Sequence, residues 1–76
     1  MVSEKIKALL ALAGKRQVDL AEHFGMTSQS MNNKMNRDSW SARDLVKAAE
    51  FTNCKLAFLL PGDQQLTIED SSDEEV

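Results

Sequence analysis

The most distinctive side chains in this sequence are short amides and hydroxyls, gathered between positions 28 and 36. The stretch reads Ser-Gln-Ser-Met-Asn-Asn-Lys-Met-Asn. An amide group both donates and accepts hydrogen bonds, and Asn and Gln match the donor and acceptor pair on the major-groove edge of adenine. Asn is also a poor helix former, so adjacent Asn residues in a helical stretch indicate binding more than structural support. The chemistry on offer is recognition by hydrogen bonds.

Residues suited to catalysis or metal binding are sparse by comparison. His23, the sole histidine, lies beside Glu22 and one helical turn from Asp19, a setting typical of a solvated helix face. There is no second histidine and no nucleophile motif to give it an acid–base role. One histidine and one cysteine also cannot complete a structural zinc site. We expect no enzyme activity, no cofactor and no bound metal.

Length and charge restrict the class of protein. A chain of 76 residues supports one small and thermodynamically marginal domain, for which dimerisation is a common remedy. The net charge is −3, but it is unevenly distributed. Residues 1–50 hold eight Lys or Arg against six acids, a balance of +2, whereas residues 51–76 hold one Lys against six acids. A basic surface on the first fifty residues is therefore compatible with a nucleic-acid partner.

The sequence shows no pattern of an exported or membrane protein. Cys54 is the single cysteine, so no internal disulfide forms, which fits a reducing compartment; its simplest role is that of a small buried residue. The opening Met-Val-Ser-Glu-Lys does not resemble a signal peptide, and no apolar run approaches the roughly 20 residues that span a bilayer. We expect a cytoplasmic protein with no membrane partner and no small-molecule substrate.

Helical periodicity fills the first part of the chain. Ser3 is a plausible N-cap for a first helix that ends at Gly14. The apolar stripe of this helix consists of Ile6, Leu9, Leu10 and Ala13. A short second helix is expected over residues 17–24, followed by Gly25, where a positive φ costs glycine little. The residues expected on its buried side are Val18, Leu20, Ala21 and Phe24.

A third helix is expected over residues 28–36, capped by Thr27. Met31 and Met35 are spaced i,i+4 and should face inward. The residues that should then face outward are Gln29, Asn32, Asn33 and Asn36. Trp40, in the loop that follows, should pack over the end of this helix and over the next one.

A fourth helix is expected after Ser41, because Ser41 and Asp44 have the spacing of a capping box. Asn53 is the expected stop. The apolar residues of this helix are Leu45, Val46, Ala48 and Ala49.

The hydrophobic period then changes from 3.6 to 2. Residues 55–60 and 65–69 flank the turn signal Pro-Gly-Asp-Gln, which predicts a β-hairpin with a four-residue loop. Residues 70–76 are acidic with little to bury, so we expect them to be disordered. The predicted fold is mainly α, a compact four-helix bundle containing a helix-turn-helix, then a C-terminal β-hairpin and a disordered acidic tail. The corresponding divisions are 1–53, 54–69 and 70–76.

The stretch from residue 17 to residue 36 resembles the helix-turn-helix of Cro and the phage repressors, the XRE family. The matching positions are the first, fifth, ninth and fifteenth of that motif, which are Gln17, Ala21, Gly25 and Met31. The small Ala21 lets two short helices approach closely, and Gly25 supplies the tight turn between them. The resemblance covers roughly residues 3–53.

This resemblance implies sequence-specific binding of double-stranded DNA by a transcriptional regulator of phage, mobile-element or bacterial type. Helix 28–36 would lie in the major groove. The equivalent of Gln17 caps the motif and contacts phosphate, and the equivalents of Ser28, Gln29 and Asn33 read bases. The eighteenth position is usually apolar but is Lys34 here, so the helix rotation leaves either Asn32 or Asn33 toward the bases. The predicted base contacts are Ser28, Gln29, Asn32 and Asn33. The predicted phosphate contacts are Gln17, Lys34, Arg37, Ser39, Ser41 and Arg43.

A homodimer is a further expectation, because two half-sites about 34 Å apart are the usual arrangement for such modules. The candidate interface is the hairpin, with Leu56, Phe58 and Leu60 on one side of it. The alternative is that the hairpin folds back onto its own helices. The rival function is a protein-interaction module, antitoxin-like or an anti-repressor, which keeps the fold without specific DNA binding.

Overall fold

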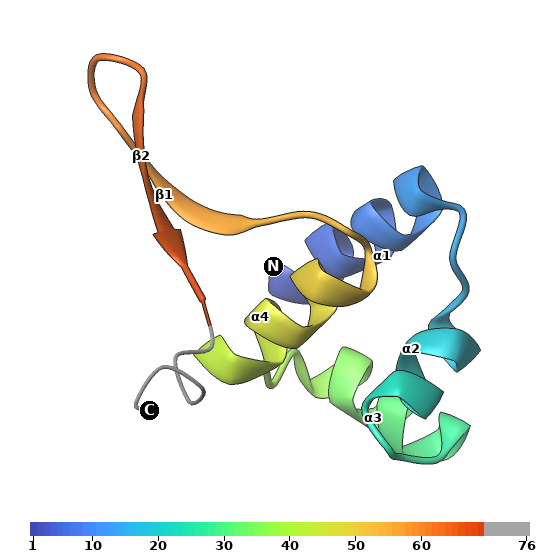
Figure 1. Cartoon of the computed structure of the whole chain (residues 1–76). Helices are drawn as coiled ribbons and strands as arrows, with labels where there is room; N and C mark the ends of the chain where they lie inside the picture. Colours follow the sequence, from blue (N-terminus) through green and yellow to red (C-terminus); the bar gives the residue numbers. More distant parts are fainter. Residues whose placement is uncertain (70–76) are drawn as a thin grey trace, which may run out of the picture.

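The computed structural model describes residues 1–69. Within them, the order of elements is α1 (Val2–Ala13), α2 (Gln17–His23), α3 (Ser28–Arg37), α4 (Ala42–Phe51), β1 (Leu56–Leu60) and β2 (Gln64–Ile68). Helix α1 runs beside α4, α2 and α3 form the opposite end of the helical body, and the hairpin extends away from it (Figure 1). The predicted mainly α fold with a terminal hairpin is confirmed. The predicted tail at 70–76 lies outside the described residues, and the division into 1–53 and 54–69 stays a prediction.

The core lies where the helices meet. Leu20 of α2 and Met31 of α3 are fully buried in it. The remaining buried members of this cluster are Ile6, Leu10, Ala21, Met35 and Ala48. The inward orientation predicted for Met31 and Met35 is confirmed, and their position fixes which side of α3 faces solvent.

Val18 is the exception to the predicted buried side of α2, since 44% of its surface is exposed. The buried side is set by Leu20, Ala21 and Phe24. Val18 precedes Leu20 by two residues, so the two side chains point about 200° apart around a helix of 3.6 residues per turn. With Leu20 directed into the core, the side chain of Val18 is directed away from it. The prediction that Val18 is buried is wrong.

A residue with positive φ follows the last residue of each helix by one or two positions. The next backbone N–H beyond it donates to a carbonyl five residues back, as in the Schellman motif. At Gly25, with φ 72°, the N–H of Met26 donates to the Ala21 carbonyl at 3.0 Å. The stops predicted at Gly14, Gly25 and Asn53 are confirmed, and α3 continues to Arg37 because Asp38 takes the positive φ.

Ser3 is not an N-cap, because it lies inside α1 and is buried. Its hydroxyl donates to the Met35 carbonyl at 2.8 Å and accepts a hydrogen bond from Trp40 Nε1 at 2.9 Å. Its backbone N–H donates to Asp38 Oδ1 at 2.6 Å, which holds the pKa of the Asp38 carboxyl below its ordinary value. A carboxylate from the end of α3 thus satisfies an N–H at the start of α1. We call these contacts the Ser3 network.

The hairpin pairs Leu56 with Ile68 and Leu60 with Gln64, so its loop has three residues, 61–63, rather than the predicted four. Pro61 followed by Gly62 at φ 82° is the combination of a type II turn, and Asp63 at φ 63° completes the reversal. The base of β1 contacts α4, but the tip extends clear of the helices (Figure 1). The alternative in which the hairpin folds back along its own helices is not observed.

The Ser3 network generates a stability prediction. Replacing Ser3 with Ala leaves the Trp40 indole N–H and the Met35 carbonyl without their partner. We expect Ser3→Ala to lower the free energy of unfolding by about 1–3 kcal/mol, the cost of buried polar groups left unsatisfied. Urea denaturation followed by Trp40 fluorescence measures it.

Ser28→Ala is the matched control, because Ser28 is exposed on α3 and its change should stay within about 0.5 kcal/mol. Equal effects of the two substitutions would show that the Ser3 network contributes nothing beyond an ordinary surface serine.

Candidate nucleic-acid interface

Helix α3 presents a polar side to solvent. Thr27 begins the helix, with its Oγ1 accepting a hydrogen bond from the Ser30 N–H at 3.1 Å. The residues predicted to face outward, which are Gln29, Asn32, Asn33 and Asn36, are all exposed. Their outward orientation is confirmed, and it follows from the burial of Met31 and Met35 on the opposite side.

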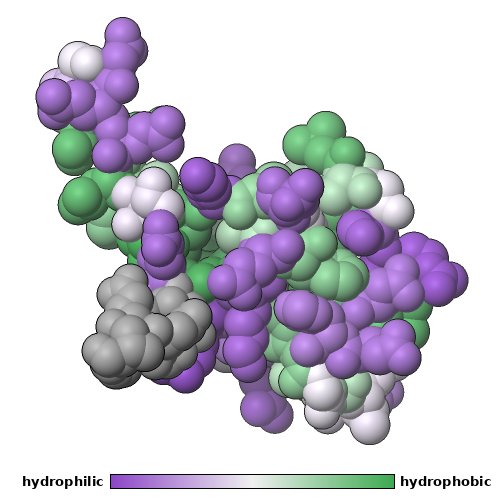
Figure 2. Space-filling model, in the orientation of Figure 1, coloured by the Kyte–Doolittle hydropathy of each residue, from purple (hydrophilic) through white to green (hydrophobic). Residues whose placement is uncertain are grey.

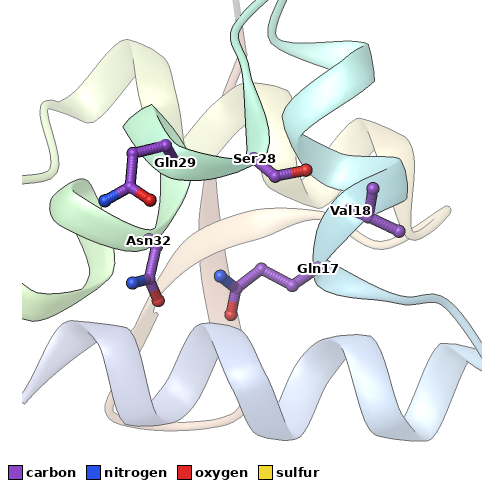
Figure 3. A pocket seen from close by; sticks show the side chains of 5 residues that line it. All are labelled: Gln17, Val18, Ser28, Gln29 and Asn32. Atoms are coloured by element: carbon purple, nitrogen blue, oxygen red, sulfur yellow. The ribbon is translucent and has the colours of Figure 1, made fainter.

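An open groove of about 390 Å³ separates the start of α2 from the start of α3. Its lining residues are Gln17, Val18, Ser28, Gln29 and Asn32 (Figure 3). In Figure 3 the amides of Gln17 and Asn32 approach one another, and the Ser28 hydroxyl points toward Val18. We call this the amide groove. The groove brings Gln17 of α2, a predicted phosphate contact, together with three predicted base contacts of α3.

Asn33 lies beside this groove, linked to it through Gln29. Gln29 Nε2 donates to Asn33 Oδ1 at 3.3 Å, across one helical turn. Asn33 also lines a second hollow of about 280 Å³ with Lys34, Arg37 and Ser39. Three predicted phosphate contacts therefore meet one predicted base contact on the far side of α3. Asn32 and Asn33 are thus both exposed, one on each side of Gln29.

Lys34 is held by contacts within the protein. Its Nζ lies 2.7 Å from Asp44 Oδ2 and 2.8 Å from the Ser39 carbonyl, and it sits 5.1 Å from the centre of the Trp40 ring. Only 18% of its side chain is exposed. A cation at a position that is usually apolar in the motif is accommodated here by a carboxylate and an indole. Lys34 joins α3 to α4, and its contact with phosphate stays a prediction.

Asp44 serves two partners. Its carboxylate accepts from the Ser41 N–H at 3.0 Å, and the Asp44 N–H donates to Ser41 Oγ at 3.1 Å, so the predicted capping box is confirmed. Burial raises the pKa of Asp44, but the hydrogen bonds from Lys34 and Ser41 outweigh it and hold the pKa below its ordinary value. The carboxylate is therefore stabilised in its charged form.

The three arginines differ in the ion pairs that they form. Arg16 donates to the carboxylate of Asp19 at the start of α2, and these bonds lower the pKa of Asp19. Arg37 and Arg43 make no ion pair within residues 1–69, and both are exposed. Arg37 lines the hollow around Asn33, and Arg43 lies in the first turn of α4.

Val18 is the residue of this surface that sequence reasoning missed. Its apolar, β-branched side chain predicts a core position, yet it lines the amide groove. The position of Leu20 and Ala21 on the helical wheel carries the signal that separates the two outcomes.

Two further features, a metal-binding cluster and a helix able to span a membrane, are absent from the part of the chain that the structure describes. Among residues 1–69 there is no cluster of three or more His, Cys, Asp or Glu side chains arranged to hold a metal ion. No helix in the same range has the length and apolar character to cross a bilayer.

Residues 6–67 match the family described as the bacteriophage CI repressor helix-turn-helix domain. The chain is also 39% identical over 62 residues to the repressor protein CI of Enterobacteria phage phi80. That alignment covers 82% of this chain but only 26% of the relative. The chain thus spans about a quarter of the length of this curated relative. No solved structure gives a significant match.

The contacts of Asp44 predict a pH dependence of stability. Its folded pKa is depressed, so its contribution is present above the unfolded value of about 4 and is lost as the pH falls through the folded pKa. We expect the free energy of unfolding of Asp44→Asn to fall less between pH 5 and pH 2 than that of the unchanged chain. Urea denaturation at each pH measures the difference.

Asp63→Asn is the control, because Asp63 lies in the exposed hairpin loop and makes no ion pair within the described residues. The same pH profile for Asp44→Asn and the unchanged chain would mean that the Lys34–Asp44 pair contributes nothing to stability.

Proposed function

This chain belongs to the family of bacteriophage CI repressor helix-turn-helix domains, and on that premise we propose that it is a DNA-binding transcriptional repressor whose helix α3 enters the major groove. The observation that carries the proposal is the two-sided character of α3. Met31 and Met35 are buried beneath it, while a row of amides faces solvent beside Gln17. A major groove admits one helix, and this exposed polar side is the one available to it.

The base contacts proposed are Ser28, Gln29, Asn32 and Asn33. The hydrogen bond from Gln29 to Asn33 leaves Gln29 Oε1 and its second N–H available as an acceptor and donor pair. Such a pair fits N6 and N7 of adenine. Asn33 retains its own NH₂ donors, which suit an acceptor on a neighbouring base. The bond also limits the rotamers of both side chains, so less entropy is lost when they bind.

The phosphate contacts proposed surround this row. Gln17 lies at one edge of the amide groove, and Arg37 and Ser39 lie at the far side of α3. Ser41, Arg43 and the partly engaged Lys34 complete the proposed set. Contacts on both sides of a recognition helix fix its position and orientation on the duplex without reading the sequence.

A homodimer is part of the proposal, with the apolar residues Leu56, Phe58 and Leu60 of the hairpin at its interface. A single module contacts few base pairs, and a two-fold pair would read two half-sites about 34 Å apart. Phe58 and Leu60 are exposed in the single chain, which supports this role.

The alternative, a protein-interaction module that keeps the fold, is not favoured by the family assignment. The dependence of binding on salt concentration distinguishes these two functions. DNA binding weakens steeply as salt is added, because the release of counterions from the phosphates, which favours binding, gains less free energy at high salt. Binding of a protein through apolar hairpin residues should hardly respond.

The proposed readout predicts the result of selecting bound duplexes from a random DNA pool. We expect the unchanged chain to enrich a palindromic consensus, and the Gln29→Ala, Asn33→Ala double variant to lose it. Each base contact removed should cost about 1–3 kcal/mol.

Asn36→Ala is the control, because Asn36 is exposed on the same helix but lines neither hollow. It should enrich the same consensus. Failure of the folded, unchanged chain to enrich any sequence at low salt would refute DNA readout by α3 and leave the protein-interaction module.

Val18 predicts a thymine contact within that consensus. It is the one apolar side chain lining the amide groove, and it lies beside Ser28 and Gln29. An apolar group at this position suits the 5-methyl group of thymine. Replacing thymine by deoxyuridine at this position in one half-site should weaken binding roughly fourfold, the effect of about 0.8 kcal/mol for one buried methyl group.

Val18→Ala should remove that sensitivity, whereas Leu12→Ala, at an exposed position on α1, should leave it unchanged. Full sensitivity to deoxyuridine in Val18→Ala would assign the methyl contact to another side chain.

A further inference from the structure

One face of the hairpin is apolar over most of its length, from the base to Leu60, whose partner is Gln64. Leu56 pairs with Ile68 and Phe58 pairs with Leu66, so these four side chains share a face, which Leu60 extends toward the tip. Phe58 is 61% exposed and Leu66 is 58% exposed. Figure 2 shows hydrophobic side chains along the hairpin, between its hydrophilic tip and the helical body. We call this the apolar hairpin face.

The exposed apolar side chains of this hairpin need a second surface on which to be buried. An isolated two-stranded hairpin is only marginally stable in water, because it has no third layer on which to bury its apolar side. Here α4 contacts the base of β1, but Phe58, Leu60 and Leu66 lie beyond that contact and stay exposed. Both strands also keep an outer edge whose backbone groups are unpaired within the described sheet.

An apolar groove of about 390 Å³ adjoins this face, between α1, α4 and the start of β1. Val2 and Leu9 line it from α1, Leu45 lines it from α4, and Leu56 belongs to both the groove and the apolar hairpin face. The two surfaces are therefore continuous. Cys54, expected to be buried, is instead exposed at the wall of this groove.

We propose that a second copy of this chain occupies both surfaces, with the two hairpins packed face to face and antiparallel, so that the tip of each reaches the groove of the other. A strand of five residues is about 17 Å long, so antiparallel packing places one hairpin's tip over the other's base. Each copy then contributes a projection and a recess, which is the self-complementarity that a two-fold interface requires. The proposal rests on the proposed homodimer and specifies its geometry.

The charges at the base and at the tip of the hairpin favour the antiparallel arrangement. Lys5 and Lys55 line the groove, whereas the loop at the hairpin tip carries Asp63. The groove lining contains no acidic residue, because Glu50 and Glu69 lie with Lys55 on a neighbouring hollow. Antiparallel packing brings the Asp63 carboxylate of each tip to the two lysines of the other copy's groove. Parallel packing would instead place the two Asp63 carboxylates together.

The reactivity of the Cys54 thiol tests this dimer geometry without any substitution in the chain. We would follow its reaction with Ellman's reagent across a range of protein concentrations, with light scattering on the same samples. We expect a dimer at high concentration, in which Cys54 reacts at least about tenfold more slowly than in the monomer, because a covered thiol must wait for dissociation.

Two hairpin variants sharpen the test. Phe58→Glu, on the apolar hairpin face, should be monomeric and keep a fast-reacting Cys54. Leu59→Glu, on the opposite face of the same strand and 81% exposed, should behave as the unchanged chain. Circular dichroism checks that both keep their helices.

Two outcomes would overturn the inference, and they differ in what else they affect. A dimer with an equally reactive Cys54 would remove docking in the groove and leave the homodimer standing. A chain that stays monomeric at high concentration would remove both, while DNA selection would still decide whether the module binds DNA.

Discussion

The turn at Gly25 is the constraint on which the rest of this structure depends. Its φ of 72° lets the Met26 N–H close back on Ala21, so α2 ends and the chain reverses within a few residues. Thr27 can then begin α3 at once. A side chain at position 25 would meet no neighbouring atom, so the requirement is for the backbone conformation and not for space. Because Leu20 and Met31 pack beneath the turn, the angle between the helices and the rotation of α3 are set together.

The two ends of α3 differ in how many contacts they make with the rest of the protein. Its later half is joined to the rest of the protein by the Ser3 network, which reaches α1, and by Lys34, which reaches Asp44 of α4. Its first turn carries Ser28 and Gln29 and faces the open amide groove. A recognition helix needs this arrangement, since a rigid base holds the geometry while the exposed N-terminal turn is left for the ligand. The internal cost of placing a cation at position 34 is offset by its carboxylate partner.

Local sequence signals predicted most of the fold. The stops at Gly14 and Gly25, the cap at Thr27 and the inward Met31 depend on neighbours within one or two turns, and the structure has them. The failures depend on distant or geometric information. Ser3 resembles an N-cap until Asp38, 35 residues away, takes its N–H, and the apolar Val18 resembles a core residue until the wheel position of Leu20 is fixed. The amides of α3 were predictable as an exposed set, but their grouping with Gln17 and Val18 required the crossing of two helices.

The most direct test of the central claim is a titration of the ¹⁵N-labelled chain with its selected duplex, followed by the amide and side-chain NH₂ signals in NMR spectra. We predict that the largest shifts fall on Gln17, Ser28, Gln29 and Asn33, including the side-chain amides, and that they disappear as salt is raised. Shifts confined to the hairpin, with the α3 signals unmoved, would contradict readout of DNA by this helix.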